Sequence, residues 1–371
     1  MKKLLLPGRH NVGEFAAALL QLEREHFASV LVLAAEGTVF TKAEYDPVLQ
    51  NTNLKVTGGL FPEILFEGER YTDATVIVAF KETMHTADFL DFTPDKIKER
   101  IDCVFANVDP VDKTIFIFID AFALNKTNLT DALYNSFGTL PRYVGGGTGS
   151  LKFEGIPCVF SNTGLIQGGA VVSIIDLQTS LGVSHGWEVI SEPLKVTEAE
   201  HNKIKSLEWR PAMDIYREVI QRHSNQIFKL ETFFEATQSY AFGIAKLGGE
   251  MVVRDPFKQE DGSIFTLDNI EQGSHVHVLF GEQNQLLEGA KRARDLAVQS
   301  STGIEKSECF IIDCISRLLF MNQDFNQEIY NLDPHRLGFG AFTLGEIANS
   351  GECYLEIFNK TAVVCKLDEP E

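Results

Sequence analysis

The sequence predicts an α/β protein of the mixed α+β kind, with hairpin-rich sheets flanked by helices. Three observations predict this class. Short apolar runs rich in β-branched residues recur along the chain, for example at 29–34 and 114–119. Segments with helical periodicity separate them, and pairs of adjacent strand-like runs follow glycine-rich elements. Because these runs come in adjacent pairs, a regular doubly wound alternation of strands and helices does not fit.

The elements follow an order that recurs three times: strand, helix, glycine turn and two adjacent strands that we expect to pair. The first copy has a strand at 29–34, a glycine turn at 56–59 and strands at 63–66 and 74–80. The second has a strand at 114–119, a helix at 129–137, a glycine-rich loop at 144–150 and strands at 157–160 and 169–176. The third has a strand at 309–314, a helix near Asn326, a glycine element at 338–340 and strands at 354–358 and 361–365. The match is one of pattern, so both a true duplication and chance similarity stay open.

Further helices and one boundary complete the prediction. Apolar residues spaced three and four apart predict amphipathic helices at 13–25, 211–221 and 286–299, and Thr93-Pro94-Asp95 is typical of a helix start. Short runs between glycines at 238–281 indicate a meander of strands. The polar stretch 190–206 is the best boundary, which predicts two modules, 1–195 and 196–371.

Charge and composition exclude some partners. The 371-residue chain has 52 Asp and Glu against 33 Lys and Arg, a net charge of −19. This balance disfavours a general nucleic-acid binder and an anionic membrane surface, since both require basic residues. We find no apolar run of the roughly 20 residues that span a bilayer, and the apolar run at 4–6 is too short for a signal peptide. Six cysteines without a Cys-x-x-Cys pair are typical of the reducing cytoplasm, where we expect this protein.

The glycine-rich segment 144–150 resembles a phosphate-binding loop, because such loops aim backbone N–H groups at anions. It fails both specific tests. The Gly-Lys-Ser/Thr pattern is absent, and Ser150 stands where the dinucleotide fingerprint has its third glycine. A tight turn with close backbone approach is the favoured interpretation, and Gly146 and Gly147 remain candidates for contact with another ligand.

Three histidines are candidates for a metal or haem. His275 and His277 share one face of a predicted strand, where Glu271 or Glu282 could complete a metal site. An ordinary pair of strand histidines is more common, so we predict no metal. A single axial histidine leaves no motif, which keeps His185, His275 and His277 open as haem ligands.

The last sixty residues hold the sharpest cluster of polar residues. Cys314 ends a predicted strand with Arg317 three residues on, and Glu346 follows a run of small residues. A nearby cation favours a thiolate, but we identify no base for a nucleophilic Cys314 and expect a buried thiol. Arg317 and Glu346 are costly to bury unpaired, so we expect a mutual pair or a polar cavity. The standard hydrolase and metalloprotease motifs are absent, so we do not predict an enzyme.

Several elements together resemble the FIST family (F-box and intracellular signal transduction). They are the 56–59 and 144–147 segments, 182–187 with 196–197, Pro211-Ala212 with Tyr216, Cys314 with Arg317, Gly338 with Phe342, 345–347, and Asn359 with Thr361. The resemblance runs over residues 15–365 and implies N-terminal and C-terminal FIST modules. It implies a sensor that binds a small ligand, an amino acid or small organic acid, and signals through a separate protein such as a histidine kinase. Two positions depart from the family pattern, at 208–212 and at Ser316.

From this resemblance we expect a ligand-binding cleft lined by Arg317, Glu346, Asn359, Cys314, Gly345, Thr361, Gly146 and Gly147. Arg317 would hold a carboxylate, while Glu346 and Asn359 would take an amino or hydroxyl group. Three alternatives stay open: a haem-binding nitric-oxide sensor, a protein-interaction scaffold without a ligand, and an enzyme that uses Cys314.

Overall fold

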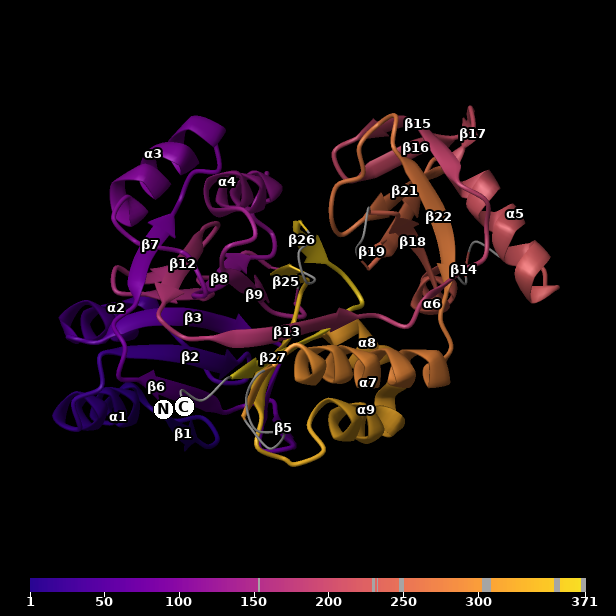
Figure 1. The fold of residues 1–371 in the computed structure, drawn as a ribbon. Helices are drawn as coiled ribbons and strands as arrows, with labels where there is room; N and C mark the ends of the chain where they lie inside the picture. Colours follow the sequence, from indigo (N-terminus) through magenta and orange to yellow (C-terminus); the bar gives the residue numbers. More distant parts are fainter. Residues whose placement is uncertain are drawn as a thin grey trace.

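The computed structural model describes residues 1–152, 154–228, 231, 233–246, 250–301, 308–349 and 354–367. Three similar units form one body, and a fourth sheet is inserted into the third unit (Figure 1). This architecture confirms the mixed α+β class. No helix in these residues is long and apolar enough to cross a membrane.

The first unit runs from the N-terminus to residue 80. Its elements are β1 (Lys2–Leu6), α1 (Val12–Arg24), β2 (Ser29–Ala35), α2 (Lys42–Asn51), β3 (Lys55–Phe61), β4 (Glu63–Phe66), β5 (Glu69–Tyr71) and β6 (Thr75–Phe80). Strand β2 is parallel to β3 and antiparallel to β6. Helix α1 begins with a capping box in which Asn11 and Glu14 satisfy each other's backbone N–H groups, and it buries Phe15, Leu19 and Leu22.

The second and third units repeat this order. The second consists of β7 (His85–Phe89), α3 (Pro94–Phe105), β8 (Thr114–Asp120), α4 (Thr127–Phe137), β9 (Arg142–Thr148), β10 (Val159–Ser161), β11 (Gly164–Ile166) and β12 (Ala170–Ile175). The third consists of β13 (Thr179–Ser184), α7 (Gln283–Gln299), β23 (Cys309–Cys314), α8 (Ile315–Met321), α9 (Phe325–Leu332), β24 (Phe339–Thr343), β25 (Glu346–Asn349), β26 (Leu355–Phe358) and β27 (Ala362–Leu367). In both, two strands are parallel, β8 with β9 and β23 with β24.

The units exchange hairpins in a closed cycle. Hairpin β4–β5 extends the third sheet beside β24, β10–β11 extends the first sheet beside β3, and β25–β26 extends the second sheet beside β9. Our prediction that the two closing strands of each copy pair with each other is therefore wrong. Strand β4 lies in the third sheet while β6 lies in the first, and the exchange ties all three units together.

The predicted glycine turn at 56–59 and glycine loop at 144–150 are wrong, because residues 56–59 lie within strand β3 and residues 144–148 lie within strand β9. One glycine of the second parallel strand lies opposite the same register position in every unit. The pairs are Val32 with Gly58, Ile117 with Gly145 and Ile311 with Gly340. A Cβ atom on these glycines would lie 1.9, 1.8 and 1.9 Å from the partner's carbonyl oxygen. Glycine is required there by close strand approach rather than by a turn.

Strand side chains alternate between two cores. In β8, Ile115 and Ile117 pack against α3 and α4, whereas Phe116 and Phe118 point to a core shared by the three sheets. The ring of Phe310 in β23 lies 5.8 Å from the ring of Phe116 and 6.5 Å from that of Phe118. These aromatic contacts join the second and third sheets without a helix between them.

The inserted sheet occupies the chain between β13 and α7. Its elements are β14 (Glu188–Val189), β15 (Leu194–Glu200), β16 (Lys203–Leu207), β17 (Arg210–Pro211), α5 (Ala212–Ser224), α6 (Phe233–Ser239), β18 (Tyr240–Ile244), β19 (Val252–Arg254), β20 (Pro256–Glu260), β21 (Ser263–Thr266) and β22 (His275–Phe280). The stretch 190–206 contains β15 and all but the last residue of β16. The modules 1–195 and 196–371 remain a proposal about sequence units, and the third sheet crosses that division because β13 pairs with β27.

Candidate functional site

A cavity of about 820 Å³ lies between the body and the inserted sheet. On the body side, the cavity is lined by the loop after β8, by helix α8 after β23, and by the turn between β24 and β25. On the side of the inserted sheet, it is lined by α6, the start of β20 and residues 267–269. Strands β8 and β23 are each the first strand of a parallel pair. The cavity therefore lies at the carboxyl ends of strands, where open α/β sheets commonly bind ligands.

Cys314 and Gly345 form part of the cavity floor, as two of the predicted site residues. The Cys314 Sγ atom lies 3.0 Å from the Ser316 Oγ atom. Burial raises the pKa of the Cys314 thiol well above its usual value, and the neighbouring Glu346 carboxyl adds to this effect. The thiol therefore stays protonated near neutral pH, which disfavours its use as a nucleophile. Gly345 has a φ of +108°, which opens the turn between β24 and β25.

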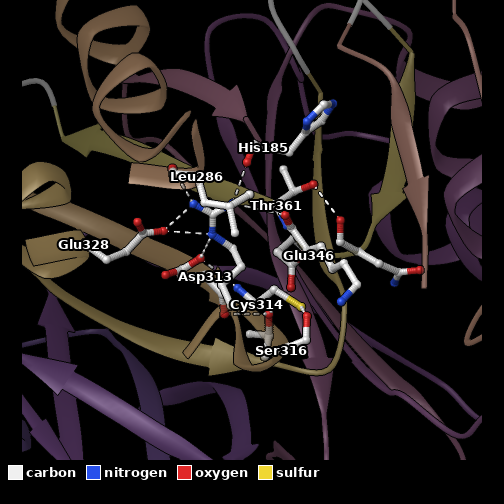
Figure 2. A network of polar contacts seen from close by, with 12 residues as sticks. His185, Leu286, Asp313, Cys314, Ser316, Glu328, Glu346 and Thr361 are labelled. Carbon is white, nitrogen blue, oxygen red and sulfur yellow. Dashed lines mark hydrogen bonds and ion pairs between the residues drawn. The ribbon is translucent and has the colours of Figure 1, made fainter. Parts of the chain in front are cut away.

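Glu346 and Thr361 lie behind this floor and are buried (Figure 2). The Glu346 carboxyl accepts hydrogen bonds from the Thr343 hydroxyl at 2.9 Å and from the Thr361 backbone N–H at 3.2 Å. Burial raises the pKa of Glu346 well above its usual value. Through these two hydrogen bonds the carboxyl links the turn that carries Gly345 to the turn that carries Lys360.

Arg317 is fully enclosed within the third unit, in contrast to the expected ligand clamp. Its guanidinium is paired with Glu328 of α9 and with Asp313, whose Oδ1 atom is 3.3 Å from Nε. It also donates to the backbone carbonyls of His185 at 2.6 Å, Leu286 at 2.8 Å and Lys360 at 3.2 Å. Figure 2 shows Glu328, Asp313, His185 and Leu286 converging on this group. With every guanidinium nitrogen engaged, Arg317 positions the cavity floor instead of facing a ligand.

Two ion pairs join the body to the inserted sheet at the cavity wall. Lys126 Nζ lies 2.8 Å from Asp268 Oδ1, and Lys360 Nζ lies 3.3 Å from Asp255 Oδ1. Asn359, a predicted site residue, donates from its side-chain nitrogen to Asp268 Oδ2 at 2.7 Å. Burial opposes the charge of Asp268, but Lys126 keeps its pKa below the usual value. Burial raises the pKa of Asp255 against the opposing effect of Lys360.

Lys360 has an unusual backbone conformation. This residue, in the turn between β26 and β27, has a φ of +51°, which is uncommon for a side chain other than glycine. Its ammonium group lies 5.2 Å from the ring centroid of Trp187, where the chain passes from the body to the inserted sheet. A buried lysine in a left-handed turn, stacked on tryptophan, is a feature typical of functional sites.

Large apolar side chains are exposed around the cavity. Leu124 has 83% of its surface exposed, Phe234 has 63% and Leu319 has 52%, and all three line the cavity. Phe122 and Phe257 add two further exposed rings. A cluster of this kind is costly to leave in water, so it marks a surface that binds something apolar.

The other predicted ligand glycines have a structural role. Gly146 lies in β9 with its Cα against Thr343, where an added Cβ would be 2.7 Å from the Thr343 Cγ2 atom. A Cβ on Gly147 would be 2.4 Å from the Leu344 carbonyl oxygen. Both glycines therefore allow β9 to approach the β24–β25 turn, and they sit beneath the cavity rather than in its wall.

The three candidate haem histidines lie in separate environments outside the cavity lining. His185 is buried, and its Nδ1 atom accepts the Trp187 backbone N–H at 2.8 Å. Burial lowers the pKa of His185 to about 4. His275 is exposed on β22, and His277 Nδ1 lies 3.1 Å from the Ser191 carbonyl oxygen. The described chain holds no cluster of three His, Cys, Asp or Glu residues suited to a metal.

Sequence reasoning missed the residues that join the two sides of the cavity. They are Lys126, Asp255, Asp268 and Lys360, together with the exposed apolar group of Phe122, Leu124, Phe234, Phe257 and Leu319. A local signal existed for Lys360, Phe122 and Leu124. Lys360 interrupts two apolar strands, and the apolar residues 122–124 continue beyond the end of a predicted strand.

Comparison with known families identifies the chain. The FIST N domain model matches residues 63–210 and the FIST C domain model matches residues 212–349, which together cover most of the sequence. The chain belongs to the FIST family. FIST domains are sensory domains of signal transduction. The residues matched by the N domain model include the loop after β8 that lines the cavity, and those matched by the C domain model include Cys314 and Gly345. A comparison with curated proteins found no match.

Proposed function

We propose that this FIST protein is a cytoplasmic sensor that binds a small molecule in the cavity between the body and the inserted sheet. The ligand-bound form would act on a separate signalling protein, such as a histidine kinase. The observation that carries this proposal is the cavity itself, whose volume of about 820 Å³ falls in the range typical of small-molecule sites.

A ligand in this position would contact both parts of the molecule. Its body-side neighbours include Leu319 of α8, and its neighbours on the inserted sheet include Phe234 of α6 and Phe257 of β20. Binding energy gained on both sides depends on how the inserted sheet sits against the body. Ligand binding therefore favours one relative position of the two parts, which gives a sensor its output.

The floor of the cavity is linked to the chain segment that leads into the inserted sheet. Arg317 donates to the carbonyls of both Lys360 and His185, and the Trp187 indole N–H donates to the Lys360 carbonyl at 3.3 Å. We assign Arg317 the role of a positioning residue in this linkage. Cys314 and Gly345 would contact the ligand, while Glu346, Asn359 and Thr361 support them from behind.

A thermal-shift screen of the purified full chain against a library of small molecules tests the proposal. A ligand at 100 times its dissociation constant should add about 2.7 kcal/mol to the free energy of unfolding and raise the melting temperature. The substitution Leu319→Ser should reduce this shift, because it removes an apolar contact at the cavity wall.

Leu140→Ser is the matched control for this substitution. Leu140 is 51% exposed, nearly the same as Leu319 at 52%, and it lies outside the cavity lining. The control should bind the hit as wild type does. If no compound stabilises the protein, or if the two variants lose the shift equally, the cavity is not the sensory site.

A further inference from the structure

We propose that the sensed ligand is an electroneutral molecule with a largely apolar body, rather than a free acid or a free amine. This inference rests on the proposed function and adds the chemical class of the ligand. It follows from how the charges and the apolar groups of the cavity are arranged.

The charged groups of the described lining form balanced pairs. Lys126 is paired with Asp268, and Lys360 is paired with Asp255. The four side chains are mostly buried, with exposed fractions of 11%, 1%, 4% and 12% in that order. Lys126 Nζ also donates to the Ala121 carbonyl at 2.6 Å. A ligand with a net charge would lose its water without gaining a counter-charge, which is unfavourable in a partly enclosed site.

The buried guanidinium of Arg317 cannot serve as a counter-charge for an anionic ligand. Arg317 makes its contacts with Asp313, Glu328 and three backbone carbonyls, and its side chain has no exposed surface. A carboxylate ligand could reach Arg317 only by displacing a buried acid from it. The structure therefore disfavours the organic acid that the family resemblance implied.

The apolar part of the lining indicates the body of the ligand. The exposed side chains of Leu124, Phe234 and Leu319 come from three different elements and surround one space. Neutral polar groups, among them Gln238 and Ser316, are interspersed with them. This combination suits a molecule with an apolar frame and a few uncharged hydrogen-bonding groups.

Two fluorescent probes with the same aromatic frame test the charge preference. N-phenylnaphthylamine is neutral, and anilinonaphthalene sulfonate carries an anionic group on that frame. We expect titration of the full chain at neutral pH to give a dissociation constant at least about tenfold lower for the neutral probe. Leu319→Ser should weaken binding of the neutral probe, and Leu140→Ser should leave that binding unchanged.

Charge-changing variants should alter this preference in a known direction. Asp255→Asn leaves Lys360 without its counter-charge and should lower the dissociation constant of the sulfonate probe about tenfold. Gln238→Lys adds a cation at the cavity wall without disturbing a buried ion pair, so it should also increase the affinity for the sulfonate probe. This variant tests the inference if Asp255→Asn does not fold.

Tighter binding of the sulfonate probe to wild type, or failure of the neutral probe to bind, would overturn the inference. A charged hit in the thermal-shift screen that requires Leu319 would also overturn it while leaving the sensor proposal intact. If neither the thermal-shift screen nor the probe titration detects binding, the inference and the sensor proposal are both wrong.

Discussion

Gly145→Ala is expected to prevent this protein from folding stably. The new Cβ atom would lie 1.8 Å from the Ile117 carbonyl oxygen, well inside any allowed contact. That atom is backbone in the adjacent parallel strand, so no side-chain rotation can relieve the clash. Separation of β8 from β9 would disrupt the sheet next to the cavity, at a cost we expect to exceed about 4 kcal/mol.

Urea unfolding followed by circular dichroism, together with the yield of soluble protein, measures this effect. Gly155→Ala is the control, because its Cβ would meet only the side-chain nitrogen of Gln167, at 3.0 Å. The control should unfold close to wild type. A Gly145→Ala variant as stable as the control would show that the two strands are not packed as described.

Arg317→Met is expected to lower the free energy of unfolding by about 3–5 kcal/mol. The substitution keeps an apolar side chain of similar length but leaves Asp313 and Glu328 buried without their cation. Burial already raises the pKa of both acids against the effect of Arg317, so both should take up protons when the guanidinium is lost. Chemical unfolding at neutral pH measures the loss.

Arg210→Met provides the comparison. Arg210 forms an ion pair with Glu218 on the surface, and both side chains are about half exposed. Exposed pairs contribute little, so this variant should unfold close to wild type. A ligand clamp at position 317 would give the opposite result for Arg317→Met, a stable fold that no longer binds its ligand.

Much of the fold was predictable because it depends on local periodicity. The apolar runs at 114–119 and 309–314 predicted β8 and β23, and the helical spacing of 286–299 predicted α7. The hairpin exchange was not predictable in the same way. A run such as 63–66 has the same apolar pattern whether it pairs with its own unit or with another, since strand partners are set by contacts distant in sequence.

The glycine segments show a second limit of the local pattern. A glycine in a turn and a glycine under the backbone of a neighbouring strand look alike in sequence, although one allows a positive φ and the other allows close approach. Gly58 and Gly145 were therefore assigned to turns although both lie in strands, and Gly58 combines close strand approach with a φ of +142°, whereas Gly345, with a φ of +108°, lies in a turn.

The candidate site was predictable only in part. The last sixty residues contain Cys314 and Gly345, which line the cavity, and also Lys360, for which the sequence predicted no role. The partners of the body's two lysines, Asp255 and Asp268, come from the inserted sheet. With 52 acidic residues in the chain, nothing local distinguishes these two. Arg317 and Glu346 were expected to pair or to face a polar cavity, whereas the partners of Arg317 in the structure are Asp313 and Glu328.

Hydrogen–deuterium exchange with and without N-phenylnaphthylamine tests the central claim most directly, because it reports on both sides of the cavity in one experiment. Our account predicts that saturating probe slows exchange at 121–127 and 314–320 in the body and at 255–257 and 267–269 in the inserted sheet. Slower exchange on one side only, or at sites away from these four segments, would contradict a ligand site shared by the two parts.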